Sequence, residues 1–261
     1  MLDNVPLQTI AVSYVALLLS LSVHECAHAA SAHWLEDDTA KRLGRMTLNP
    51  LPHIDILGTI VLPLVGMITG WRVLGWAKPV PVDPRNLSRK FTQRTGMAMV
   101  AGAGPASNLL LSLICIPALA LAVHAILSDV EGLSQAVLPR AKMYMFMAAM
   151  YEPVEAFPKH LNVNFSMDVI FLITLLGRMV IINIGLAIFN LLPFGPLDGA
   201  SIMRGFLPWQ WLPAFDKAQP ILTIAILILF LVGGIRYILF PFFWVAENLY
   251  IGPLSRLFLG V

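Results

Sequence analysis

Four long apolar segments are the feature that most constrains the fold of this 261-residue chain. They cover about residues 7–33, 96–127, 168–193 and 219–246. A helix needs roughly 20 apolar residues to cross the hydrocarbon core of a bilayer, and each segment is at least that long. Only 12% of the residues are charged, about half the share of an ordinary soluble domain. The sequence therefore predicts an all-α polytopic membrane protein with about four main transmembrane helices.

The rest of the chain leaves no room for a large soluble appendage, so we expect a single membrane domain over residues 1–261. Its core would cover about residues 7–205, and the C-terminal span about residues 219–246. The first residues lack both a basic region and a small-residue cleavage site, so the first apolar segment is expected to be a retained span. The two cysteines lie in apolar segments, which does not suggest a disulfide framework.

Three shorter stretches do not have the length or composition of complete spans. Residues 56–70 are apolar but contain three glycines and a proline, which fits a re-entrant or interfacial segment as well as a span. Residues 143–150 are apolar but short, so they predict an interfacial or partial helix. Residues 75–82 contain two prolines and are expected to be extended and partly β. We therefore predict a membrane-associated extended or β hairpin over residues 56–82.

The first apolar segment contains an H-E-x-x-H motif at residues 24–28. Residues i and i+4 of a helix share one face, so His24 and His28 can reach the same metal ion. Glu25 is close enough to take a proton from a metal-bound water. Three such polar residues are unfavourable in lipid unless they have partners or a function. The motif therefore predicts a metal site within the bilayer.

Catalytic zinc usually takes three protein ligands and a water, so a third ligand is expected elsewhere in the chain. The longer soluble pattern requires Gly and His where this chain has Ser31 and Trp34. Glu36 lies about two helical turns beyond His28. The remaining histidines fit loop or interface residues better than ligands; they are His33, His53, His124 and His160.

Asp198 is the strongest candidate for the third ligand. It follows a helix that is broken by Pro193 and Pro196, and such a break lets a turn lie at membrane depth beside a polar cavity. An Asp-Gly pair often does no more than form a turn at a surface. Together with the motif at residues 24–28, however, Asp198 is favoured as a ligand.

Three motifs together resemble the site-2 protease family of intramembrane zinc metalloproteases, peptidase family M50. They lie at residues 24–28, 104–108 and 190–199, in the order found in that family. Asn49-Pro50 and residues 75–82 resemble its compact branch, which lacks a PDZ domain. The likeness extends over about residues 15–205. The chain departs from the family pattern at two positions: it has Gly195 where a Pro is frequent, and Ala200 where a second Gly follows the Asp. Neither departure removes a ligand, so we expect an altered shape of the site rather than lost activity.

The resemblance implies a site and a reaction. One Zn²⁺ per chain would be bound by His24, His28 and Asp198, and Glu25 would be the general acid/base. The substrates would be single-span membrane proteins, cut within or near their transmembrane helices in regulated intramembrane proteolysis. Asn190 and Asn108 could hold the substrate backbone or stabilise developing charge.

Other functions and partners can also be weighed from the sequence. Residues 75–82 could pair with an unwound substrate as an added strand. The alternative functions are a membrane transporter or metal-binding carrier that uses the intramembrane His and Asp residues, or an inactive scaffold. Transport would not require Glu25 between the histidines, and the complete ligand set argues against an inactive protein. We expect the lipid bilayer as an environment and no nucleic-acid partner, while the sequence indicates no oligomeric state.

The proposed metal site also requires a particular membrane topology. The first and third apolar segments must have their C-terminal ends on the same side, which holds if residues 56–70 and 143–150 both span or both fail to span. If neither of these segments spans the membrane, the positive-inside rule places the end with the metal site at the cytoplasmic face. We expect a multi-pass protein of a prokaryotic inner membrane. The cytoplasmic side carries eleven cations and the other side four. The eleven are Lys41, Arg42, Arg45, Arg72, Lys78, Arg85, Arg89, Lys90, Arg94, Arg204 and Lys217, and the four are Arg140, Lys142, Lys159 and Arg256.

Overall fold

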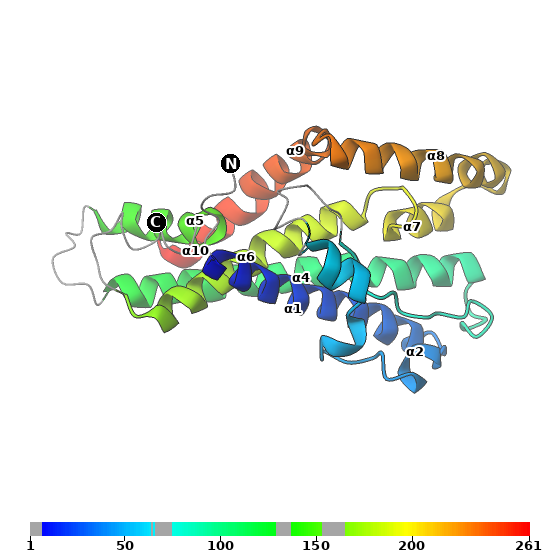
Figure 1. The fold of residues 1–261 in the computed structure, drawn as a ribbon, viewed down its shortest axis with the longest axis horizontal. Coiled ribbons are helices and arrows are strands. Elements are labelled where there is room, and N and C mark those ends of the chain that lie inside the picture. The colour runs from blue at the N-terminus through cyan, green and yellow to red at the C-terminus, as the bar shows by residue number, and fades with distance from the viewer. Residues whose placement is uncertain (1–6, 64, 66–74, 129–136, 153–164) are drawn as a thin grey trace. The chain divides into compact units, whose positions relative to one another are not determined.

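The computed structural model describes residues 7–63, 65, 75–128, 137–152 and 165–261, and helices joined by loops make up these ranges (Figure 1). In chain order the α-helices are α1 (Leu7–Trp34), α2 (Thr39–Arg42), α4 (Gln93–Ser128), α5 (Leu138–Tyr151), α6 (Met167–Asn190), α7 (Asp198–Phe206), α8 (Leu212–Leu231), α9 (Ile235–Ala246) and α10 (Gly252–Leu259). Two short 3-10 helices, η1 (Leu51–His53) and η3 (Trp209–Trp211), and two π-helices, η2 (Ile56–Val61) and η4 (Glu247–Ile251), complete the described elements.

Four segments in the described ranges are long and apolar enough to cross a membrane. They are α1, α4, α6 and the stretch Trp209–Leu231, which contains η3 and α8. This confirms the predicted number of main spans, and α1, α4 and α6 have nearly the predicted bounds. Length and hydropathy are sufficient here because a helix in lipid must satisfy its backbone hydrogen bonds internally over a fixed thickness.

The last predicted span, residues 219–246, is wrong in extent. α8 begins earlier, at Leu212, and ends at Leu231, and α9 starts separately at Ile235. Gly233 lies between them with a φ of 75°, a left-handed conformation that glycine adopts without a Cβ clash and that commonly ends helices. Hydropathy continues across this point, so a prediction from hydropathy alone joins the two helices.

The predicted hairpin over residues 56–82 is also corrected, because no β-strand is present in the described residues. Its first arm begins with the π-helix η2, and the part from residue 66 to 74 lies outside the described residues. The second arm is irregular and extended, and its backbone bonds to the short helices η1 and η2 instead of a strand. Trp76 N donates to Gly58 O at 3.2 Å and Lys78 N to His53 O at 2.9 Å.

α5 has 14 residues, as expected of a partial helix.

The chain groups into two compact units, each assembled from separate stretches of sequence. Unit 1 comprises Met1–Ser20, Leu109–Gly185 and Phe242–Val261, and unit 2 comprises Leu21–Asn108 and Leu186–Pro241. Both α1 and α6 start in unit 1 and end in unit 2, whereas α4 runs from unit 2 into unit 1. The C-terminal ends of α1 and α6 therefore belong to the same unit, as the metal hypothesis requires.

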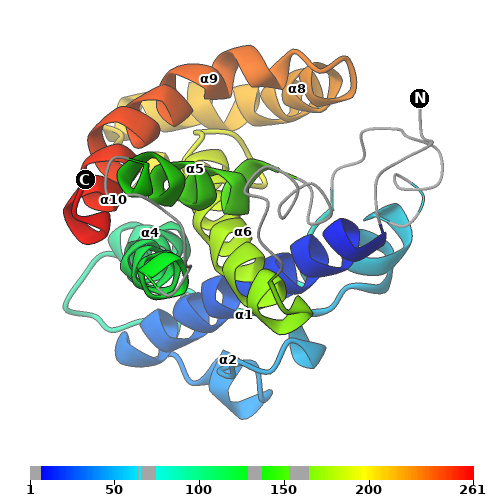
Figure 2. The ribbon, with the colours of Figure 1, turned by 90° about the vertical axis from the view of Figure 1, so that its left-hand side faces the viewer.

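Unit 1 consists of apolar helices, and two polar side chains on α6 have partners within it. α5 and α10 lie side by side there (Figure 2). The Arg178 guanidinium donates to Met150 O and Glu152 O, each at 2.7 Å. Asn183 Nδ2 donates to Ser20 Oγ at 2.8 Å. Polar groups in a membrane protein need such partners, so these contacts account for Arg178 and Asn183 in the third apolar segment.

Unit 2 is held together where α1 ends and α4 begins. Ala32 and Leu35, on and just after α1, pack with Val100 of α4 and with Leu87 from the preceding loop. Ala32 is fully buried and Leu35 is 3% exposed. Small and medium side chains let two helices approach closely in lipid. This close approach places the motif of α1 directly against α4.

Candidate metal centre

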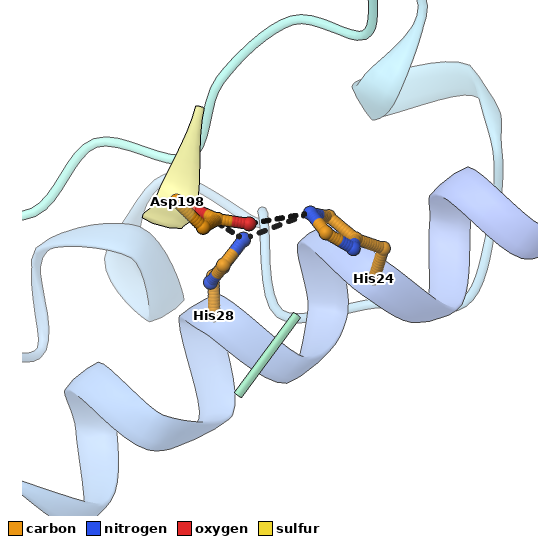
Figure 3. A group of neighbouring side chains, drawn as sticks. All are labelled: His24, His28 and Asp198. Atoms are coloured by element: carbon orange, nitrogen blue, oxygen red, sulfur yellow. Dashed lines mark hydrogen bonds and ion pairs between the residues drawn. The ribbon is translucent and has the colours of Figure 1, made fainter. Parts of the chain in front are cut away.

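The two histidines of the motif face one another on α1 within unit 2. Both are buried, and the two Nε2 atoms are 3.0 Å apart. Asp198 is the first residue of α7 and faces both rings (Figure 3). Its Oδ2 lies 3.2 Å from His24 Nε2, and its Oδ1 lies 3.3 Å from His28 Nε2. The structure therefore brings together the three residues that the sequence nominated as a ligand set.

The far side of each imidazole is fixed by α4. His28 Nδ1 lies 2.8 Å from Val100 O, and His24 Nδ1 lies 2.6 Å from Asn108 Oδ1. A carbonyl oxygen only accepts hydrogen bonds, so the Nδ1 of His28 carries a proton, and in the neutral ring this leaves the lone pair on Nε2. With the Asn108 amide oxygen turned to His24, the same holds for that ring. Such outer contacts commonly set the tautomer and the orientation of metal-binding histidines.

These tautomers test whether the residues fit a metal ion. Two Nε2 lone pairs and a carboxylate converge on one small space, and their ligand atoms all lie within 4.8 Å of one another. Asp198 Oδ2 is buried and has no hydrogen-bond partner within the described part of the chain. Three converging electron-rich atoms repel one another unless a cation lies between them. Two imidazole nitrogens and one carboxylate form a donor set typical of catalytic zinc.

Gly104 of α4 gives the rings room. A Cβ at this position would lie 2.5 Å from His24 Cε1 and 2.5 Å from His28 Nε2, closer than any ordinary contact. Gly104 and Asn108 are one helical turn apart, so a single face of α4 both accommodates the rings and contacts His24. The sequence indicated Gly104 as a small residue that allows close helix approach, but its contact with the two histidine rings was not predicted.

Asp198 is positioned by a loop that α8 holds. Gly195 N donates to Gln219 Oε1 at 2.6 Å, and the Thr223 hydroxyl donates to Gly195 O. At Gly199 a Cβ would lie 2.3 Å from Leu192 O, so only glycine lets the loop fold against the start of α7. No pattern in the sequence indicates Gln219 or Thr223, because their partners are backbone atoms of a loop.

Glu25 lies beside the three candidate ligands and is 8% exposed. Its Oε2 accepts a hydrogen bond from Val80 N at 3.1 Å, so the extended segment reaches the motif. A cleft of about 580 Å³ opens here, entirely within unit 2. His24, Glu25, His28 and Asp198 line it, together with apolar side chains from four further segments. These include Trp76, Val80, Met97, Phe189 and Leu197.

The two predicted asparagines occupy different places. Asn190 lines the cleft, and its Nδ2 donates to Leu186 O at 3.0 Å. Asn108 is fully buried and contacts His24 from behind the ring. Asn190 is thus placed to contact a molecule in the cleft, whereas Asn108 is placed to contact a candidate ligand.

Comparisons with known proteins identify the family of the chain. The family model described as peptidase family M50 matches residues 12–233. A curated protein of Bacillus subtilis (strain 168), "Putative zinc metalloprotease YwhC", is 32% identical over 238 residues, which is 90% of this chain and 87% of that protein. No solved structure matches the chain significantly. With its apolar helices and this likeness over most of its length, the chain belongs to peptidase family M50 and is a multi-pass membrane zinc metalloprotease.

Proposed function

We propose that this protein hydrolyses peptide bonds within or near the transmembrane segments of single-span membrane proteins, in regulated intramembrane proteolysis. The observation that carries the proposal is the convergence of His24, His28 and Asp198 beside Glu25, in a cleft formed by membrane-length helices. A peptide bond must reach this cleft to be cut. Membrane-embedded segments are the substrates with the shortest path to it.

One zinc ion per chain would be held by His24 Nε2, His28 Nε2 and the Asp198 carboxylate. When bound, zinc acts as a Lewis acid that makes a water molecule more acidic and polarises the scissile carbonyl. Asn108 and Val100 O keep both histidines in the tautomer that presents Nε2. We assign Asn108 this positioning role, which differs from the substrate role expected from the sequence.

Glu25 is proposed as the general acid/base. Its carboxylate accepts a proton from the attacking water, the water oxygen bonds to the carbonyl carbon, and the proton passes to the departing amine nitrogen. The Val80 amide bonds to one oxygen of this carboxylate and thereby fixes its orientation. Asn190, on the wall of the cleft, is proposed to hold the substrate backbone.

The extended segment has a backbone edge suited to an unwound substrate. The N–H groups of Trp76 and Lys78 donate to Gly58 O of η2 and His53 O of η1. Backbone groups of successive residues in an extended chain point to opposite sides, so Ala77 presents its peptide groups the other way. Ala77 lines the cleft. A substrate segment would therefore pair along Ala77, whereas the Val80 amide contacts Glu25.

The cleft is proposed to open toward the cytoplasmic side of a prokaryotic inner membrane. The eleven cations assigned to the end that holds the candidate ligands, against four at the other, support this orientation. In this orientation a substrate would be cut near the cytoplasmic end of its span.

Cleavage of membrane substrates tests the proposal. The enzyme is reconstituted in vesicles with a panel of tagged single-span proteins, and products are located by mass spectrometry. We expect cuts inside or next to the transmembrane segment that disappear with a zinc chelator. Each substrate is matched by a variant whose Gly and Pro residues in the span are changed to Leu, which should be cut more slowly because its helix resists unwinding. Cuts confined to soluble tails would contradict the proposal.

A further inference from the structure

Two buried charged residues lie just after α1, outside the cleft. Asp37 is fully buried and Arg45 is 7% exposed, whereas Arg42, between them in the chain, is exposed. Burying a charge is unfavourable unless hydrogen bonds compensate for lost water. Asp37 and Arg45 flank the short helix α2, and both contact the extended segment at residues 75–83, here called the strap.

Asp37 binds the C-terminal end of the strap. Its Oδ2 accepts a hydrogen bond from Asp83 N at 2.8 Å, and its Oδ1 accepts one from Thr39 N at 3.0 Å. Burial alone would raise the pKa of Asp37, but these and further hydrogen bonds outweigh it, so the pKa lies below its ordinary value. The carboxylate is therefore charged, and it ties the strap to the chain that leaves α1.

Arg45 binds the strap on the other side of Val80. Its Nη2 donates to Lys78 O at 2.5 Å, and its Nε has no partner among the described residues. A guanidinium stays charged in proteins, and the bond to the strap replaces one of the hydrogen bonds that this buried charge loses from water. The bond also ties Lys78 O to the chain that follows α2.

Between these two anchors the strap contacts Glu25. Pro79 and Pro81 have no N–H, so the Val80 amide is the one backbone donor of residues 79–81. That donor binds Glu25 Oε2 at 3.1 Å. The proline rings also restrict φ on both sides of Val80. A short, stiff length of backbone, fixed at Lys78 O and Asp83 N, therefore presents a single amide to the proposed base.

We propose that Asp37 and Arg45 are positioning residues that act on hydrolysis through the strap, by holding the Val80 amide against Glu25. The inference rests on the proposed role of Glu25. Loss of either anchor lets the strap move, the Val80 contact weakens, and Glu25 is misaligned with the attacking water. A misplacement of about 1 Å can slow a reaction by roughly 100-fold, so we expect kcat to fall about 10- to 100-fold.

The test compares Asp37→Ala and Arg45→Gln with matched controls on the same segment, Asp38→Ala and Arg42→Gln. Asp38 and Arg42 carry the same charges but pair near the surface, at 3.9 Å from each other. The readouts are kcat, zinc content and amide hydrogen exchange of the strap without substrate. Both anchor variants should lose kcat and exchange faster at Val80 and Asp83, with native zinc content. The controls should match the wild type in all three.

Arg45→Lys keeps the charge but reaches less far, so it should show a smaller change in both kcat and exchange, even if the other variants do not fold. A variant with fast strap exchange and native kcat, or with lost kcat and native exchange, would overturn the inference. Hydrogen exchange needs no substrate, so it reports on the strap independently of the reaction. A wild-type enzyme that cleaves no membrane substrate would instead refute the proposed function.

Discussion

Replacing Glu25 with Gln is expected to remove nearly all cleavage while zinc remains bound. Gln has the size of Glu and can still accept the hydrogen bond from Val80 N, but it cannot take a proton from water. General acid/base groups contribute about 10²- to 10⁴-fold to rates, so kcat should fall by that order. Glu25 is not in the cluster formed by His24, His28 and Asp198, so zinc content should stay at the wild-type level.

Glu36→Gln is the matched control for this prediction. Glu36 is an exposed carboxylate just beyond α1, and it does not line the cleft. The control removes the same charge from the same end of the helix, so a general electrostatic effect would appear in both variants. Native kcat in Glu25→Gln, measured on a substrate that the wild type cuts, would show that Glu25 is not the base.

Replacing Gly104 with Ala is expected to disrupt zinc binding without unfolding the protein. The new Cβ would lie 2.5 Å from His24 Cε1 and His28 Nε2, so both rings must rotate away. Rotation breaks their contacts with Asn108 and Val100 O. Loss of a single outer contact typically lowers metal affinity 10- to 100-fold. Zinc affinity, measured by competition with a chelator, should therefore fall by about 100-fold or more.

Gly102→Ala provides the comparison on the same helix. A Cβ at Gly102 has no neighbour within 4 Å, so this variant adds the same methyl group without a clash. It should bind zinc as the wild type does, and Ala should slightly favour the helix. If the two variants have equal zinc affinity, the close packing of α4 against the rings is not what shapes the site.

The sequence predicted the parts of this protein that follow from local chemistry. The spans α1, α4 and α6 follow from hydropathy, because lipid requires long apolar helices. His24 and His28 could be paired because helical spacing places i and i+4 on one face. Asp198 was found through the broken helix before it, together with the order of the motifs. Apart from the order of the motifs, each of these signals lies within one short segment of the chain.

The remaining features depend on contacts between distant segments, which no local pattern records. Val80 contacts Glu25 through a backbone amide, so the identity of its side chain carries no signal, and Gln219 likewise contacts a backbone amide, that of Gly195. The extended arm was predicted from its prolines, but its partners are the short helices η1 and η2, so it forms no strand. The break at Gly233 depends on a left-handed φ that glycine permits without requiring.

The central claim is that Asp198 completes a zinc site with His24 and His28. The most direct test is the zinc content of the purified wild type beside Asp198→Ala, with Asp216→Ala as control because Asp216 forms an ion pair with Arg204 away from the cleft. We expect about one zinc per chain in the wild type and the control, and a large loss in Asp198→Ala, which leaves two of the three ligands usual for catalytic zinc. An unchanged zinc content in Asp198→Ala would contradict the claim.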